Sequence, residues 1–251
     1  SMSKYLATLA YLGAAYKGFE RQKKYKTIQG EVERALSSLL GEPSFIHGAG
    51  RTDAGVNAKG QTFSFLAKRT IKDNPAFIYA FNRLLPSDIA VTSLKEVPLS
   101  FDARHSCLGK VYSYSFYLGK KDPYLSLTTA YFGERKFDYK ALKEALLLFM
   151  GEHNFRDFTT KAEDKDSFIR NVTSISFNDD YGKIDKVSTI TFKSNGFMTY
   201  QIRIMMGSAF KVALGQMTLE DIKIHLMTTS RHIISYKAPA NGLTLEEVIY
   251  G

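Results

Sequence analysis

Apolar residues recur along the first part of the chain at two different spacings, which predict strands and helices in alternation. A mostly apolar run over 4–12, bounded by Gly13, predicts a strand that is buried on both faces. After Thr27, apolar residues recur every three or four positions as far as Gly41. That spacing predicts a helix with Thr27 as its N-terminal cap, Gly41 as its C-terminal stop and the apolar stripe in the core.

The same alternation continues further along the chain. Alternating residues at 61–66 predict a second strand, and 89–97 predicts a third. Between them, Asn74 followed by Pro75 predicts a capped helix start, and Pro86 ends that helix. The resulting β-α-β-α-β order is typical of an α+β sheet with helices packed on one face.

Beyond residue 105 the two patterns return. They predict a strand at 109–117, a helix at 138–150, a β-hairpin formed by 169–177 and 186–193, a long apolar helix from 195 to 214, and a short helix capped by Thr218 and Asp221. Charged residues at 161–167 predict a mobile loop. In the strand at 109–117, Lys110, Tyr112, Tyr114 and Phe116 share one face, and an aromatic stripe of this kind usually faces a core.

A glycine-rich polar stretch, Gly48–Ala58, precedes the predicted strand at 61–66. It places the guanidinium of Arg51 close to the carboxylate of Asp53 in a run of glycines, whose backbone can take positive φ or approach a ligand closely. Such a stretch is often no more than a turn with local hydrogen bonds. It is equally a way to hold a charged side chain out toward a ligand.

The segment 14–26 is too polar to pack and alternates basic with aromatic residues. Arg21, Lys23, Lys24 and Lys26 are crowded together there, near two tyrosines. An exposed loop with incidental charge would look similar. We favour the alternative, a surface that follows a phosphate backbone.

The overall charge supports a polyanionic partner. The chain has 251 residues, 44% of them hydrophobic and 24% charged, which is ordinary for a globular protein. Its 34 Lys and Arg residues outnumber 25 Asp and Glu, giving a formal net charge of +9. A basic excess of this size favours nucleic acid, and 15 Tyr and 18 Phe supply rings that can stack on unpaired bases.

The residues that bind metals or form disulfides are sparse. Cys107 is the single cysteine, and the five histidines lack close metal-ligand spacing, so we expect neither a metal nor a redox cofactor. The sequence has no apolar run near the ~20 residues that cross a bilayer and no signal-peptide pattern, so a cytoplasmic protein without membrane association is expected.

The run Gly50-Arg51-Thr52-Asp53-Ala54-Gly55-Val56 resembles the signature loop of the TruA-type tRNA pseudouridine synthases. The resemblance implies that Asp53 is the catalytic nucleophile. It also implies that Arg51 occupies the space left by a flipped-out base and holds the phosphate of that nucleotide. The chain departs from the family at Asn57, where His is usual, and at Glu20, where Gln is usual.

Two further motifs carry the same resemblance. Lys110-Val111-Tyr112-Ser113-Tyr114 is similar to the family's second motif, whose first Tyr lies against the target uracil and maps to Tyr112, with Lys110 as a substrate-binding candidate. The segment from Gly196 to Arg203 is similar to the third motif, whose Arg pairs with the catalytic Asp. Ala238-Pro239-Ala240-Asn241-Gly242-Leu243 matches a family segment near the C-terminus.

The resemblance implies an architecture as well as a reaction. We expect an α+β pseudouridine synthase fold, in which two related ferredoxin- or RRM-like halves form one long mixed sheet with helices on one face and a central active cleft. Residues 1–104 would carry the Asp loop and 105–251 the Tyr and Arg motifs. A homodimer is implied, as is isomerisation of uridine to pseudouridine, without a cofactor, in the tRNA anticodon stem-loop (positions 38–40 of tRNA).

The residues are compatible with more than one mechanism, substrate and function. Asp53 could attack C1′ of the ribose or C6 of the ring. The substrate could be ribosomal RNA, or the chain could be a catalytically idle RNA-binding or RNA-folding protein. An Asp-dependent nucleosidase would cleave the glycosidic bond without rejoining it, and it would release free uracil.

Overall fold

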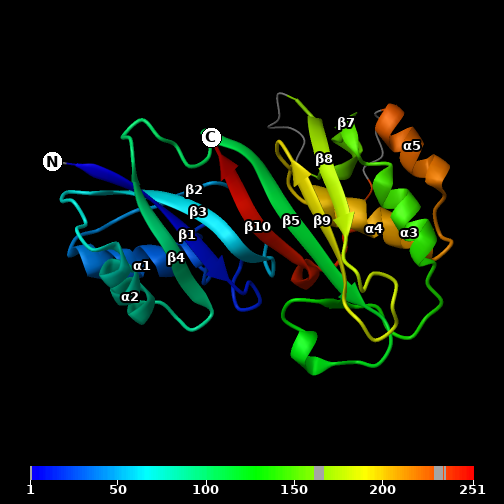
Figure 1. Ribbon diagram of the computed structural model, residues 1–251, viewed down its shortest axis with the longest axis horizontal. Helices are drawn as coiled ribbons and strands as arrows, with labels where there is room; N and C mark the ends of the chain where they lie inside the picture. Colours follow the sequence, from blue (N-terminus) through cyan, green and yellow to red (C-terminus); the bar gives the residue numbers. More distant parts are fainter. Residues whose placement is uncertain (1, 161–166, 229–233, 235) are drawn as a thin grey trace. The chain divides into compact units, whose positions relative to one another are not determined.

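The computed structural model describes residues 2–160, 167–228, 234 and 236–251, which fall into two units (Figure 1). The first unit comprises Ser1–Leu108 together with Thr244–Gly251, and the second comprises Gly109–Leu243. Of the predicted loop at 161–167, residues 161–166 lie outside the described residues. None of the helices in the described ranges is both long enough and apolar enough to cross a membrane.

The first unit is a sheet with two helices. Its elements are β1 (Ser3–Tyr11), α1 (Ile28–Leu40), β2 (His47–Gly48), β3 (Asn57–Ala67), α2 (Asn74–Leu84), β4 (Ile89–Val97) and β10 (Leu243–Tyr250). The strands follow the order β4-β1-β3-β10, and the short β2 pairs with β3. β1 is antiparallel to both of its neighbours, whereas β10 runs parallel to β3. The predicted β-α-β-α-β order is therefore confirmed.

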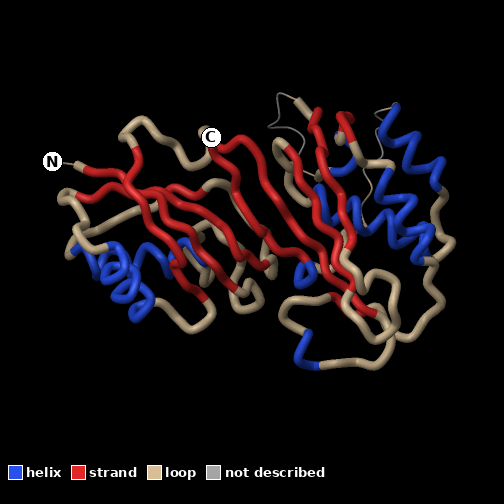
Figure 2. The backbone as a smooth tube through the Cα atoms, viewed as in Figure 1, coloured by secondary structure: helices blue, strands red, loops and turns tan. Residues whose placement is uncertain are grey.

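Aromatic residues join the helices to the sheet in this unit. Phe77 and Phe81 of α2 contact Phe65 and Phe63 of β3, with ring centroids 6.2 and 6.3 Å apart. Helix α1 contacts α2, so the two helices cover the same face of the sheet (Figure 2). The rings are largely buried, and aromatic burial of this kind dominates the stability of a core.

The ends of α1 agree with the sequence pattern, and the start of α2 does not. The Thr27 side chain accepts a hydrogen bond from the Gly30 amide, and Gly41 ends the helix with φ of 74°. The prediction that Asn74 caps α2 is wrong, because the preceding Asp73 accepts from the Ala76 amide at 3.0 Å. Asn74 is the first helical residue, and its side chain donates to the carbonyl of Leu94 on β4 at 3.0 Å.

The C-terminal strand belongs to the first unit. Thr244 and Leu245 of β10 lie opposite Asn57 and Ala58 at the start of β3. The sequence motifs predict this segment in a second half that begins at residue 105. Pairing with β3, far away in the sequence, instead groups 244–251 with Ser1–Leu108.

The second unit combines a mostly antiparallel sheet with α-helices and short 3-10 helices. Its elements are β5 (Cys107–Tyr117), the 3-10 helix η1 (Pro123–Leu125), β6 (Ala130–Tyr131), α3 (Tyr139–Leu147), β7 (Gly151–Asn154), η2 (Arg156–Phe158), β8 (Ile169–Phe177), β9 (Ser188–Ser194), α4 (Gln201–Ala213), α5 (Leu219–Met227) and η3 (Ala240–Gly242). The strand order is β5-β9-β8-β7, and β6 pairs with β5. The predicted hairpin is β8 and β9, which are antiparallel.

Helix α4 forms the centre of the second unit. Phe210 of α4 lies against Tyr114 and Phe116 of β5, with ring centroids 6.0 and 5.2 Å away. The helix begins at Gln201, later than the expected 195, because Tyr200 adopts the left-handed conformation with φ of 65°. A non-glycine residue there costs roughly 1–2 kcal/mol, so the surrounding structure must hold it in place. Arg203, which is partly buried, follows about one turn later.

Candidate active site

The loop that carries Asp53 is held to the rest of the first unit through its neighbour Thr52. The Thr52 carbonyl accepts a hydrogen bond from the Phe19 amide at 3.1 Å, and its hydroxyl is 2.7 Å from the hydroxyl of Tyr11. The Asp53 carbonyl accepts from the Val56 amide at 3.1 Å and closes a turn. Thr52 is buried while Asp53 is partly exposed, so the backbone beside Asp53 is held in place and the residue itself is not fully enclosed by the unit.

A buried polar group, the hydroxyl of Tyr11, supports this loop through hydrogen bonds. Tyr11 accepts from the Gln61 side chain at 3.4 Å, and the same amide donates to the Gly50 carbonyl at 3.2 Å. Burial raises the pKa of Tyr11 to about 12, while its bonds to Thr52 and Gln61 work in the opposite direction. The phenol therefore stays protonated across the ordinary pH range and remains a constant hydrogen-bonding group.

Two glycines let neighbouring segments approach the loop closely. A Cβ on Gly13 would overlap the Val56 carbonyl, and a Cβ on Gly18 would lie 3.0 Å from the Thr52 carbonyl oxygen. Gly18 also has φ of 85°, which disfavours any side chain. The segment between β1 and α1 therefore lies directly against the backbone on either side of Asp53.

Asn57, at the position where the family usually has His, also contacts the segment that follows β1. Its side-chain oxygen accepts from the Gly13 amide at 2.8 Å, and the residue is buried. The bond ties the end of β1 to the start of β3, next to the Asp53 loop. Asn57 therefore has a defined local contact, although it differs from the His that is usual in the family.

Arg51 is exposed and pairs with the other departure, Glu20. The NH1 atom of Arg51 is 3.1 Å from Oε2 of Glu20, and both side chains are more than half exposed. An exposed pair of this kind is worth about 0–1 kcal/mol, so a phosphate can replace the carboxylate at little cost.

The resemblance implies that Arg51 binds a phosphate of the substrate RNA, so replacing Glu20 by Gln should tighten RNA binding. The change removes a negative charge that competes with phosphate for Arg51, and we expect the Kd for tRNA to fall about two- to fivefold at low salt. Titration of labelled tRNA measures it. Glu42→Gln is the matched control, because Glu42 forms a comparable exposed pair with Lys68 at 3.0 Å. An unchanged or weaker affinity for Glu20→Gln, relative to that control, would contradict the competition.

The predicted basic loop is a small hairpin with two of its lysines at the tip. The Lys17 amide donates to the Lys26 carbonyl at 2.9 Å, and Gln22 bridges to Tyr25. Lys23 and Lys24 form the turn between Gln22 and Tyr25. Both are exposed, as is Lys26. The Lys26 amine lies 5.1 Å from the ring of Tyr16.

Arg21 differs from the other cations of this loop. Its NH1 atom is 2.7 Å from Oε1 of the buried Glu33, and its guanidinium lies 5.3 Å from the ring centre of Phe45. The sequence pattern predicts that Arg21, like the lysines, contacts a phosphate. In the fold, the positive charge of Arg21 is paired with the Glu33 carboxylate.

In the second unit, the residues from the tyrosine motif lie along β5. Tyr112 is 9% exposed, and its ring meets Phe197 edge-on at 5.4 Å. Lys110 on the same face is partly exposed and lies opposite Ser194 of β9. Tyr114 is fully buried, and its hydroxyl donates to the Pro239 carbonyl at 2.7 Å.

Arg203 is fixed by a backbone carbonyl. Its Nε donates to the carbonyl oxygen of Ala238 at 2.8 Å, and the Ala238 amide donates back to the Arg203 carbonyl at 2.9 Å. The guanidinium also lies 5.7 Å from the ring centre of Tyr200. Burial raises the pKa of Tyr114, and the positive charge of Arg203 opposes that rise, so the two groups are neighbours.

The carbonyls of Ala238 and Pro239 are functional groups that sequence reasoning missed. Adjacent in the chain, they orient Arg203 and Tyr114 respectively. A Cβ on Gly207 of α4 would overlap Tyr236, which shows how closely the segment 236–239 crosses the helix. The match of Ala238–Leu243 to a family segment was the available signal, although it said nothing of these carbonyls.

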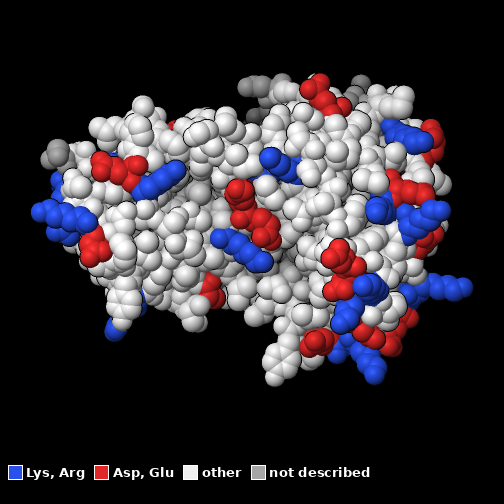
Figure 3. Space-filling model, viewed as in Figure 1, with Lys and Arg blue, Asp and Glu red and all other residues white. Residues whose placement is uncertain are grey.

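The charged side chains are mixed on the face shown in Figure 3, where Lys and Arg alternate with Asp and Glu within each unit. The net charge of +9 is therefore not gathered into one uniform patch on that face. Among the described residues, no group of three or more His, Cys, Asp or Glu side chains is arranged to hold a metal ion.

The candidate residues thus fall in two different units. Asp53 and Arg51 lie on one loop of the first unit, and Tyr112 and Arg203 lie in the second unit. The pairing of Asp53 with Arg203 stays a prediction.

Comparison with known proteins gives the family. A model described as tRNA pseudouridine synthase matches residues 7–106 and 145–251, which include Asp53 and Arg203. The chain belongs to the tRNA pseudouridine synthase family. Tyr112 lies in the interval between the two matched segments.

Full-length relatives in this family agree. The chain is 33% identical to tRNA pseudouridine synthase A of Acetivibrio thermocellus and 34% identical to that of Clostridium kluyveri, in each case over 96% of this chain and 97% of the relative. It is 33% identical to tRNA pseudouridine synthase A of Streptococcus pyogenes serotype M49 over 99% of both chains. The predicted membership of the family and its α+β pseudouridine synthase fold are confirmed.

Proposed function

We propose that this chain isomerises uridine to pseudouridine in the anticodon stem-loop of tRNA. The observation that carries the proposal is the Asp53 loop, whose backbone is held by Thr52 and which also carries the exposed Arg51. A loop of this sequence in a chain of the tRNA pseudouridine synthase family has a direct chemical use. It supplies a nucleophile and an anion-binding group to the same nucleotide.

The reaction moves one glycosidic bond. The bond between N1 of uracil and C1′ of ribose breaks, the base turns, and C5 bonds to C1′ in place of N1. The proton on C5 leaves, and N1 gains one, so the product has the same composition as the substrate. No electrons enter or leave, and the step requires no redox partner. Asp53 acts by forming a transient covalent bond to the substrate.

The other site residues act on the base and on the nucleophile. Arg203 would pair with the Asp53 carboxylate, for which a guanidinium offers planar, two-point geometry. Tyr112 would lie against the uracil, where its hydroxyl can move the proton that leaves C5. Lys110, on the same face of β5, would contact the substrate backbone.

The target base must leave the stack before it can react. Extrusion costs a few kcal/mol, and a side chain that fills the vacated space recovers part of that cost. Arg51 is suited to this because it is exposed and is held only by the surface carboxylate of Glu20 among the contacts described above. We further propose that the enzyme works in the cytoplasm as a homodimer, so that one tRNA contacts both copies.

The experiment that tests this function is tritium release from RNA labelled at C5 of uridine. Unmodified tRNA transcripts and ribosomal RNA transcripts are compared side by side. Release from tRNA alone supports the proposal. Release from ribosomal RNA alone would keep the chemistry and replace the substrate, and release from neither would support a catalytically idle RNA-binding protein.

The lysines at the hairpin tip should contribute to RNA binding through charge alone. Replacing Lys23 and Lys24 together by Gln should reduce the slope of log Kd against log salt concentration by about 1–2, because each phosphate contact contributes about 0.7–0.9. Binding titrations at several salt concentrations measure the slope. The double change of Lys120 and Lys121, also adjacent and exposed, is the control for net charge. Equal slopes in the two double variants would show that the hairpin lysines are not part of the RNA-binding surface.

A further inference from the structure

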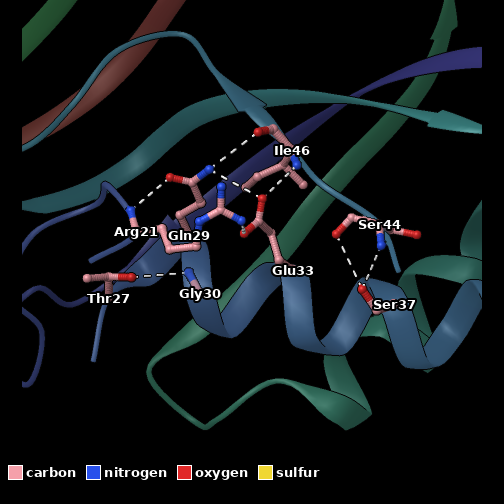
Figure 4. A network of polar contacts seen from close by, with 8 residues as sticks. All are labelled: Arg21, Thr27, Gln29, Gly30, Glu33, Ser37, Ser44 and Ile46. Carbon is pink, nitrogen blue, oxygen red and sulfur yellow. Dashed lines mark hydrogen bonds and ion pairs between the residues drawn. The ribbon is translucent and has the colours of Figure 1, made fainter. Parts of the chain in front are cut away.

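A buried carboxylate connects the two segments that flank the Asp53 loop. Glu33 lies in the middle of α1 and is 6% exposed. Glutamate is rarely buried unless it is paired. Its Oε1 receives the NH1 of Arg21 at 2.7 Å, and its Oε2 receives the Ile46 amide at 3.0 Å and the Gln29 side chain at 3.3 Å (Figure 4).

These donors come from different parts of the chain. Arg21 belongs to the basic hairpin, whereas Ile46 directly precedes β2 and the Asp53 loop. Gln29 joins them, because its side-chain oxygen accepts from the Arg21 amide at 2.9 Å and its Nε2 approaches the Ile46 carbonyl at 3.4 Å. Figure 4 shows the side chains of Arg21, Gln29 and Glu33 converging between the helix and the segment at Ile46.

The contacts form a closed circuit of hydrogen bonds that passes through Thr52, the residue before Asp53. The Thr52 carbonyl accepts from Phe19, and the Phe19 carbonyl accepts from the Gln29 amide at 2.8 Å. Glu33 then links Gln29 to Ile46, from which the chain returns through β2 to Thr52. Thr52 precedes Asp53, so the position of the nucleophile depends on a ring of bonds in which Glu33 is the charged member.

We propose that Glu33 is a positioning residue for Asp53, and that Arg21 serves Glu33 rather than an RNA phosphate. Two carboxylate oxygens satisfy three donors, and the Arg21 charge balances the buried negative charge. A glutamine at position 33 offers a single oxygen and places an NH2 group against the remaining donors. Part of the circuit then opens while α1 keeps its apolar stripe and its caps. The proposal rests on the proposed function.

The test compares Glu33→Gln, Arg21→Gln and the double variant. The control is Glu31→Gln with Arg34→Gln, an ion pair at 3.0 Å on the same helix in which Arg34 is exposed. All assays are run well below the melting temperature of each variant, which is measured first. The measured quantities are single-turnover rate on tRNA, tRNA Kd and its salt slope, and amide hydrogen exchange over residues 44–56.

We expect Glu33→Gln to slow turnover by about tenfold or more, since small misplacements of a reacting group are costly. Its tRNA Kd should stay within about twofold, because the exposed lysines are unchanged. Exchange should accelerate over 44–56 and remain slow in the paired centres of β1 and β3. Arg21→Gln should leave the salt slope unchanged, and the double variant should be no slower than Glu33→Gln alone. The control pair should behave as wild type.

Three results would overturn the proposal. Normal turnover in Glu33→Gln would mean that the circuit does not position Asp53. A salt slope reduced by about 1 in Arg21→Gln, additive in the double variant, would return Arg21 to the RNA surface. Unchanged exchange over 44–56 would separate Glu33 from the loop. If wild type modifies no RNA, the proposed function fails, whereas the exchange measurement still reports whether Glu33 orders the loop.

Discussion

Replacing Asp53 by Asn should abolish turnover and leave tRNA binding nearly unchanged. The amide cannot form the covalent bond to the substrate, and loss of a nucleophile costs about three orders of magnitude or more. The loop itself should persist, because Thr52 and the Asp53 carbonyl hold it through backbone atoms and the Thr52 hydroxyl. Tritium release in a single turnover and titration of tRNA binding measure the two properties separately.

The control for this variant is Asp102→Asn. Asp102 is another carboxylate of the first unit, and it accepts from the Arg104 and His105 amides in an exposed turn. It should retain wild-type turnover. If Asp53→Asn remains folded but loses tRNA binding together with turnover, Asp53 contributes to binding and its assignment as nucleophile is unsupported.

Arg203→Lys should lose most activity, by about 10²-fold, although it keeps the positive charge. One nitrogen of Arg203 is already committed, since Nε donates to the Ala238 carbonyl at 2.8 Å. The guanidinium has further donors with which to meet the Asp53 carboxylate in a planar arrangement. A lysine has a single nitrogen and cannot reproduce both contacts in that geometry. Turnover and tRNA Kd, measured together, test this.

Arg170→Lys provides the matched control for the loss of a guanidinium. Arg170 also lies in the second unit, and its NH1 donates to the carbonyls of Ser167 and Ile169 at 3.0 and 2.8 Å. It should keep turnover close to that of wild type. Near-normal turnover in Arg203→Lys would rule out a requirement for two-point pairing with Asp53.

Sequence patterns predicted best those features that depend on neighbouring residues. Helix α1 was bounded correctly because Thr27 and Gly41 act within one turn of the helix that they end. The start of α2 was misplaced by one residue, since Asp73 and Asn74 are both good caps and only the fold gives Asn74 its partner on β4. Local chemistry alone could not separate the two.

Features that depend on distant segments were not predicted. β10 pairs with β3 across most of the chain, and no local pattern specifies such a partner. Arg21 is one of several cations in its loop, and its pairing with Glu33 forms only when folding brings that loop to α1. The Ala238 carbonyl that orients Arg203 is a backbone atom, which a sequence does not distinguish from any other.

The candidate site divides in the same way. Asp53, Tyr112 and Arg203 are predicted as site residues because three motifs resemble those of one family, and the family match includes the first and last of them. The groups that hold them were visible only in the fold. These are Thr52 and Tyr11 beneath the Asp53 loop, and Ala238 beside Arg203.

The measurement that bears most closely on the proposed reaction is a nucleoside balance. Unmodified tRNA is incubated with the enzyme and digested completely, and uridine, pseudouridine and free uracil are quantified. Isomerisation by Asp53 predicts that pseudouridine gained equals uridine lost, with no free uracil and no change in the Asp53→Asn reaction. Free uracil equal to the uridine lost would show a nucleosidase, and unchanged uridine in tRNA that the protein binds would show a catalytically idle RNA-binding protein.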